Sequence, residues 1–164
     1  TTLNLLILFV FTSGEELGWR GYLQRRMETA FGVRRGIMLL GLIWGFWHAG
    51  MHVQGVMISP DADPLVVTFL ITPFYFLGLG SFFGWLYLRT RSVWIPAIAH
   101  AAHNRLSSQL SACLDLGEIG DYGAFSAMAL GWCAVGLFLL WGVGSPREET
   151  ETAEDGPPAP QEPS

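Results

Sequence analysis

Five stretches of apolar residues, separated by short polar segments, account for most of the chain. They cover residues 1–11, 36 to about 57, 65–88, 93–113 and 122–144. The third and the fifth are each long enough to span a bilayer as a helix, which takes about 20 apolar residues. The first is too short to span unless its helix continues through the glutamates that follow it. The pattern predicts an all-α fold, a polytopic transmembrane bundle of about five helical segments.

The C-terminal residues 145–164 differ in character from the rest. They carry a run of Glu and Asp followed by Pro-Pro-Ala-Pro. Such a segment cannot bury enough apolar surface to fold by itself. We therefore expect one membrane domain over residues 1–144 and a disordered, acidic, proline-rich cytoplasmic tail over 145–164. The chain begins with Thr, not Met, and has no charged leader, so we expect further segments to precede it.

Charge is sparse, at 14% of residues, and it is distributed unevenly. All basic residues are Arg, and most lie between the first and second or the third and fourth apolar stretches, whereas the other loops carry Asp and Glu. Basic residues concentrate in the cytoplasmic loops of membrane proteins. We therefore interpret the arginines as topology signals and expect no nucleic-acid partner. The all-Arg usage and the short loops favour an integral protein of the bacterial cytoplasmic membrane.

All four histidines lie in two clusters within otherwise apolar stretches. An ionisable group inside a bilayer costs several kcal/mol unless it is paired or hydrated, so such groups usually mark function. His48 and His52 are four residues apart, as are His100 and Asn104, and each pair shares one helix face. His103 lies beside the second pair. Asn104 adds a neutral hydrogen-bond donor of the kind that stabilises an oxyanion.

Two adjacent glutamates and an arginine form a second polar group near the N-terminus. Glu16 and Arg20 are four residues apart, so they can pair along one face of a helix. Glu15 lies about 100° round the helix from Glu16 and points elsewhere. It is therefore available as a general base. The alternative is that both glutamates are interfacial groups beside an Arg-rich cytoplasmic loop.

Three motifs, in order, resemble those of the CPBP family. Residues 14–23, GEELGWRGYL, look like its first motif, EExxxR. Residues 41–48, GLIWGFWH, resemble the second motif, an aromatic residue followed four positions later by His, and residues 89–104 end in the third, HxxxN. The family comprises type II CAAX prenyl endopeptidases and bacteriocin-processing proteins, also described as Abi or lysostaphin-resistance-protein-A-like intramembrane proteases. The likeness covers about residues 5–110.

The resemblance implies a role for each matching residue. Glu15 would be the base that activates the attacking water, and His48 would assist as acid/base or hold that water. His100 and Asn104 would polarise the scissile carbonyl and stabilise the oxyanion. The implied function is an intramembrane endopeptidase that cleaves a membrane-associated protein or peptide near the cytoplasmic face, in CAAX-type processing or in bacteriocin-related maturation or immunity.

Three further residues of the motifs would support this site. Glu16 and Arg20 would hold it together, and Arg20 would also be near the substrate. Trp44 stands where the family pattern commonly shows Phe, and as a large aromatic it should be tolerated. His52 and His103 lie outside the minimal motifs and have no assigned role.

The sequence leaves the need for a metal open. A hydrolytic zinc site has three protein ligands and an open position, and Glu15, His48 and His100 could supply the ligands for zinc or another divalent metal. However, the chain has no HExxH, and we expect no carboxylate near either histidine pair to orient the ligands. A water activated by Glu15, with no obligatory metal, is therefore favoured.

Two alternatives belong to other functional classes. One is a haem-binding membrane subunit in which His48 and His100 are the axial ligands, but haem ligation gives no reason for the EExxxR motif. The other is a non-enzymatic membrane scaffold or immunity protein of the same fold, because a shared fold does not guarantee turnover. The intact motif positions favour the peptidase.

Overall fold

The structure, a computed structural model, describes residues 2–48, 66, 69, 71–113 and 117–142. The elements it assigns there are all helices. They are α1 (Thr2–Glu16), η1 (Leu17–Leu23), α2 (Gln24–Phe31), α3 (Val33–Trp47), α6 (Thr72–Thr90), α7 (Trp94–Cys113) and α8 (Gly117–Gly142). Because α1, η1 and α2 follow one another without interruption, the described residues form five continuous helical segments. This confirms the predicted all-α fold.

Two helix boundaries differ from the prediction. The first segment does not end at residue 11 but continues through both glutamates and a π-helical stretch, η1, to the end of α2. The second ends sooner than expected, since α3 stops at Trp47 with His48 as its C-cap. His48 therefore lies at a helix end, not in the middle of an apolar segment. His52 and the tail over 145–164 lie outside the described residues.

Within the described part of the chain, no helix combines the length and the apolar character needed to cross a bilayer. The polytopic arrangement and the sidedness of the loops stay predictions.

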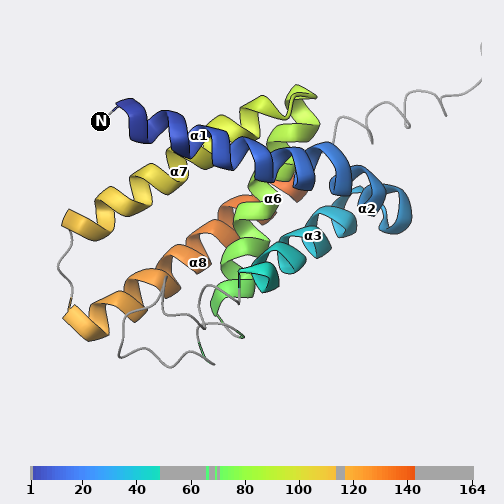
Figure 1. The fold of residues 1–164 in the computed structure, drawn as a ribbon. Coiled ribbons are helices and arrows are strands. Elements are labelled where there is room, and N and C mark those ends of the chain that lie inside the picture. The colour runs from blue at the N-terminus through green and yellow to red at the C-terminus, as the bar shows by residue number, and fades with distance from the viewer. Residues whose placement is uncertain (1, 49–65, 67–68, 70, 114–116, 143–164) are drawn as a thin grey trace, which may run out of the picture.

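Helix α6 runs through the middle of the bundle, where it packs against α8 and α3, while α1 lies along α7 (Figure 1). The main cluster of buried side chains lies where these helices meet. It consists of Trp44, Tyr75, Phe76, Leu79, Phe83 and Ala129. Polar side chains are also buried here, and they form the candidate site described below.

A single glycine reverses the chain between α2 and α3. Gly32 has a φ of 80°, a conformation that glycine adopts at little cost, and its N–H donates to the Glu28 carbonyl at 2.9 Å. The two helices then run in close contact, because a Cβ on Gly36 would lie 2.6 Å from the Met27 backbone. This tight turn returns α3 toward α1 and brings the second motif near the first.

Helix α7 is fixed at both its start and its side. Ser92 Oγ accepts the Trp94 N–H at 3.3 Å as the helix begins. One turn later the Ala97 carbonyl accepts a hydrogen bond at 3.4 Å from the buried Thr12 hydroxyl of α1. Thr12 precedes Glu16 by four residues and Ala97 precedes His100 by three, so this contact sets the first and third motifs side by side.

Because α6 and α8 are in close contact, we expect one added methyl group between them to lower the stability of the fold. A Cβ on Gly136 would lie 2.0 Å from the Gly78 carbonyl oxygen, so Gly136→Ala forces the two backbones apart. We expect it to lower the free energy of unfolding by about 3 kcal/mol, the upper range for overpacking, as measured by thermal melting of the purified protein in detergent.

The matched control is Gly131→Ala on the same helix. A Cβ there would meet nothing within 4 Å, so this variant should be as stable as the parent chain or more stable by up to about 1 kcal/mol. Equal melting temperatures for the two variants would contradict the packing described for α6 and α8.

Candidate active site

The two glutamates of the first motif stand where α1 passes into η1. In η1 the Gln24 N–H donates to the Trp19 carbonyl, five residues back, as in a π-helix. Short π-helical stretches inside α-helices are frequent at functional sites. Here the stretch follows Glu16 directly and contains Arg20, so it sets how the motif residues are presented to α3, α6 and α7.

Glu16 is the centre of a buried ion-pair network. It is 0% exposed, and its Oε1 accepts hydrogen bonds from Arg20 Nη1 at 3.1 Å and from His100 Nδ1 at 2.9 Å. The first contact confirms the predicted pairing of Glu16 with Arg20. The second joins residues 84 positions apart in the sequence. Because Nδ1 of His100 holds the proton of this bond, the lone pair of the neutral ring is on Nε2.

The Arg20 side chain is itself fully enclosed. Its Nη2 donates to the Gly80 carbonyl of α6 at 3.4 Å, and its guanidinium lies 4.7 Å from the Trp44 ring centroid and 5.3 Å from that of Phe83. A planar, permanently charged group suits this combination of hydrogen bonding and aromatic stacking. Arg20 therefore ties η1 to both α3 and α6.

Trp44 contacts three of the four residues predicted to be catalytic. Its Nε1–H donates to Glu15 Oε2 at 3.3 Å, and its backbone carbonyl accepts a hydrogen bond from His48 Nδ1 at 2.8 Å. The centroid of its ring lies 5.5 Å from the His48 ring and 5.2 Å from the His100 ring. Glu15, His48 and His100 thus gather around one buried indole.

Trp44 and Phe76 hold His48 at the end of α3. Its ring stacks on Phe76 of α6 with centroids 4.1 Å apart and planes 22° apart. Since a carbonyl can only accept, Nδ1 carries the proton in the bond to Trp44, and the lone pair of the neutral ring is on Nε2. A histidine fixed in this tautomer can accept a proton at Nε2.

Asn104 lies one helical turn beyond His100 on α7 and is partly buried. Among the described residues, no hydrogen bond joins it to the other three. It lines a cleft of about 380 Å³ between α1 and α7, together with Leu8, Phe11 and Arg105. The structure therefore brings three of the predicted catalytic residues together and places the fourth one turn along α7 from His100, at a cleft between α1 and α7.

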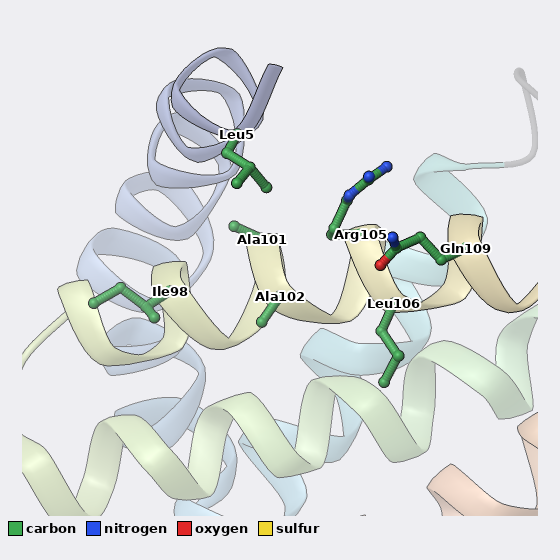
Figure 2. Close-up of a pocket in the computed structure, with 7 residues that line it drawn as sticks. All are labelled: Leu5, Ile98, Ala101, Ala102, Arg105, Leu106 and Gln109. Carbon is green, nitrogen blue, oxygen red and sulfur yellow. The ribbon is translucent and has the colours of Figure 1, made fainter. Parts of the chain in front are cut away.

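A second cleft of about 390 Å³ adjoins the first and shares Leu5 and Arg105 with it. Figure 2 shows Leu5 of α1 above the surface of α7, with Arg105 and Gln109 side by side at one end. The remaining lining residues are apolar: Ile98, Ala101, Ala102 and Leu106. The hollow beside Asn104 thus combines an apolar floor with one cationic side chain.

His103, which had no assigned role, contacts side chains of α6, α7 and α8. Its Nε2 is hydrogen-bonded to the Tyr75 hydroxyl at 2.5 Å and to Ser107 Oγ at 3.4 Å, and its ring lies 5.1 Å from that of Trp132. These contacts join α7 to α6 and α8. The structure therefore gives His103 a place in helix packing, beside the core cluster that also contains Trp44.

Two buried polar residues were missed by the sequence analysis. Gln24 Nε2 donates to Glu28 Oε1 at 2.8 Å and to the Gly84 carbonyl of α6 at 3.3 Å. With Glu16 and Arg20, they form a series of buried polar side chains spaced four residues apart along one continuous helical segment. That spacing was the signal in the sequence, but residues 24–28 looked like a cytoplasmic loop because two arginines interrupt them.

The candidate metal ligands do not form a metal centre in the described part of the chain. In that part, no group of three or more His, Cys, Asp and Glu side chains could hold an ion. Glu15 and His48 are each hydrogen-bonded to Trp44 instead. One expectation was wrong, however. Glu16 does lie against His100, as an orienting carboxylate would, because the helix continues past residue 11 and carries Glu16 to α7.

A comparison with protein families agrees with the motifs. The family model described as "Type II CAAX prenyl endopeptidase Rce1-like" matches residues 1–106, well over half of the chain. The chain belongs to this family. The Rce1-like match includes all three motifs and ends two residues after Asn104. The predicted family is therefore confirmed.

One relative of this Rce1-like chain is "CAAX prenyl protease 2" of Methanococcus maripaludis. The two are 24% identical over 126 residues, which cover 76% of this chain and 46% of the relative. The chain thus spans about half the length of that protein. No solved structure matches the chain.

The ion-pair network predicts that Arg20→Ala destabilises the fold. Removing one partner of a buried ion pair leaves an uncompensated charge, here on Glu16, and typically costs about 3–5 kcal/mol. We expect a loss of this size in the free energy of unfolding, measured by thermal or denaturant unfolding in detergent. Arg35→Ala, at an exposed position of α3, is the control and should change stability by no more than about 0.5 kcal/mol. Equal losses in both variants would contradict a special role for Arg20.

Proposed function

We propose that this chain is the catalytic part of an intramembrane endopeptidase that hydrolyses a peptide bond in a membrane-associated protein or peptide. The observation that carries the proposal is the gathering of Glu15, His48 and His100 around Trp44, in a chain of the Rce1-like family. The substrates would be those of CAAX-type processing, as in the name of the Methanococcus maripaludis relative, or of bacteriocin-related maturation or immunity.

In the proposed reaction, a water molecule is activated between Glu15 and His48. Glu15 takes a proton from the water while the oxygen of that water attacks the scissile carbonyl carbon. Nε2 of His48 accepts a hydrogen bond from the same water or receives its proton. The proton then passes to the nitrogen of the leaving group as the C–N bond breaks, so one water is consumed for each new carboxylate and amine.

The oxyanion that forms would be stabilised from α7. The protonated ring of His100 donates through Nε2, and the Asn104 side-chain amide adds a second donor, as in other acyl-transfer sites. Glu16 supports this role, because its hydrogen bond with Nδ1 at 2.9 Å fixes the orientation of the His100 ring. Glu16 and Arg20 act in this mechanism as supporting residues and do not take part in proton transfer.

The location in a membrane is part of the proposal. Large apolar side chains are exposed along α1, α7 and α8, with Phe11 72% and Leu130 71% exposed. Soluble monomers rarely expose large contiguous apolar patches, so lipid is the natural neighbour for these faces. With the arginine-rich segments on the cytoplasmic side, the site would open toward the cytoplasmic face of a bacterial membrane.

The mechanism predicts the effect of four alanine substitutions. Glu15→Ala, His48→Ala and His100→Ala should each abolish cleavage, because each removes a group needed in the transition state. Asn104→Ala should lower kcat by about a hundredfold, the usual loss for one oxyanion donor. The measurement is release of product from a fluorogenic CAAX-type peptide by the purified protein in lipid vesicles, with circular dichroism to show that the helices persist.

Gln109→Ala is the control on the same helix as His100 and Asn104. Gln109 is exposed at the second cleft, so this variant should keep at least half of the parent kcat. Full activity in Glu15→Ala would refute the assigned base, and full activity in all four variants would refute the peptidase proposal.

We further propose that no metal is obligatory. Activity should survive dialysis against a chelator such as 1,10-phenanthroline, with kcat unchanged within about twofold, because water activation by Glu15 needs no ion. Metal analysis of the dialysed protein is the accompanying measurement. Loss of activity that zinc restores would overturn this part of the proposal and leave the peptidase assignment intact.

A further inference from the structure

We propose that Trp44 is a positioning residue for both water-activating groups: its indole N–H orients Glu15, and its backbone carbonyl orients His48. This inference rests on the proposed function. Trp44 does not touch the reacting atoms in the mechanism above, and it acts through the two residues that do. One contact is made by the side chain of Trp44 and the other by its backbone, so the two can be tested separately.

The indole is a fixed donor. Trp44 is 1% exposed, and its ring packs against Phe76 at 4.7 Å, Phe83 at 6.0 Å and the Arg20 guanidinium at 4.7 Å. A ring enclosed in this way cannot follow the movements of a flexible side chain. Glu15 is partly exposed and has three rotatable side-chain bonds, so the bond at 3.3 Å restricts the glutamate and not the tryptophan.

The indole N–H of Trp44 is also an uncharged donor, so the surroundings of Glu15 differ from those of Glu16. Glu16 is bound by the charged Arg20 and by His100, which hold it as a structural anion. Glu15 receives a hydrogen bond through Oε2 from an uncharged N–H. Its charge is thereby oriented but not neutralised, and the lone pairs of Oε1 remain to accept a proton.

The carbonyl contact depends on the end of helix α3. Near the C-terminus of a helix, a His side chain can hydrogen-bond one of the last carbonyls. Here the backbone N–H of His48 is shared between the Trp44 and Gly45 carbonyls, at 3.3 and 3.1 Å. The Trp44 carbonyl therefore has capacity for the His48 Nδ1–H at 2.8 Å. This bond selects the tautomer with its lone pair on Nε2.

Trp44→Phe isolates the indole half of the inference. It keeps an aromatic ring in the core and the backbone carbonyl, and it removes the N–H. We expect kcat to fall about tenfold or more with KM unchanged within about twofold, because a lost hydrogen bond to a charged group that orients the base affects the reaction and not the binding of substrate. The assay is the fluorogenic-peptide assay in lipid vesicles.

Trp19→Phe is the matched control. Trp19 is partly buried, its ring lies 6.5 Å from that of Trp44, and its indole N–H bonds to no other described residue. This variant should keep kcat within about twofold. Unchanged kcat in Trp44→Phe, or an equal fall in both variants, would overturn the inference.

A second measurement does not depend on activity. The chain has seven tryptophans, and the indole N–H signal of Trp44 in an ¹⁵N–¹H NMR spectrum is the one lost in Trp44→Phe. In Glu15→Ala this signal should move upfield while that of Trp19 stays in place. A Trp44 signal that does not move overturns the inference whether or not the chain cleaves peptides. If the parent chain does not cleave but the signal moves, the proposed function is rejected and the hydrogen bond stands.

Discussion

The described structure depends on one buried carboxylate. Removing an ionised glutamate from water costs several kcal/mol even after the protein relaxes, and Glu16 is 0% exposed. The charge is stabilised through a single oxygen, Oε1, since Oε2 has no hydrogen-bond partner among the described residues. Its partners come from η1 and α7, so the fold is stable only when these two elements are held at the right distance. The network therefore determines where His100 lies.

Glu16 and its neighbour Glu15 have different surroundings, although they are adjacent in the sequence. Glu16 points into the bundle toward Arg20 and His100, whereas Glu15, about 100° round the helix, reaches the indole of Trp44. One glutamate is paired with a cation and the other with a neutral donor. In the proposed mechanism, this difference in environment, and not a difference in residue type, allows one of two identical side chains to act as the base. The family pattern commonly shows Phe at position 44, and Phe has no donor, so the indole contact with Glu15 is a feature of this chain.

Sequence reasoning recovered the local contacts and missed those between distant residues. The pairing of Glu16 with Arg20 follows from helix geometry, as does the divergence of Glu15, so both could be predicted. The contacts of Glu16 with His100 and of Glu15 with Trp44 join different helices, and no spacing encodes them. The first segment was predicted too short because its polar residues resemble a helix end followed by a loop. In the structure those at 16, 20, 24 and 28 form an inward-facing row on a helix that does not end there.

That row also explains why α6 is rich in glycine where it meets the site. Arg20 and Gln24 donate to the carbonyls of Gly80 and Gly84, which only a close approach of side chain to backbone permits. A Cβ on Gly80 would lie 2.8 Å from the Gly41 backbone of α3, so any side chain there would push α3 outward. Because α3 carries Trp44, such a shift would move the indole away from Glu15. Helix packing and site geometry are therefore one constraint, and the small residues of α6 are as much a part of the site as the charged residues that face them.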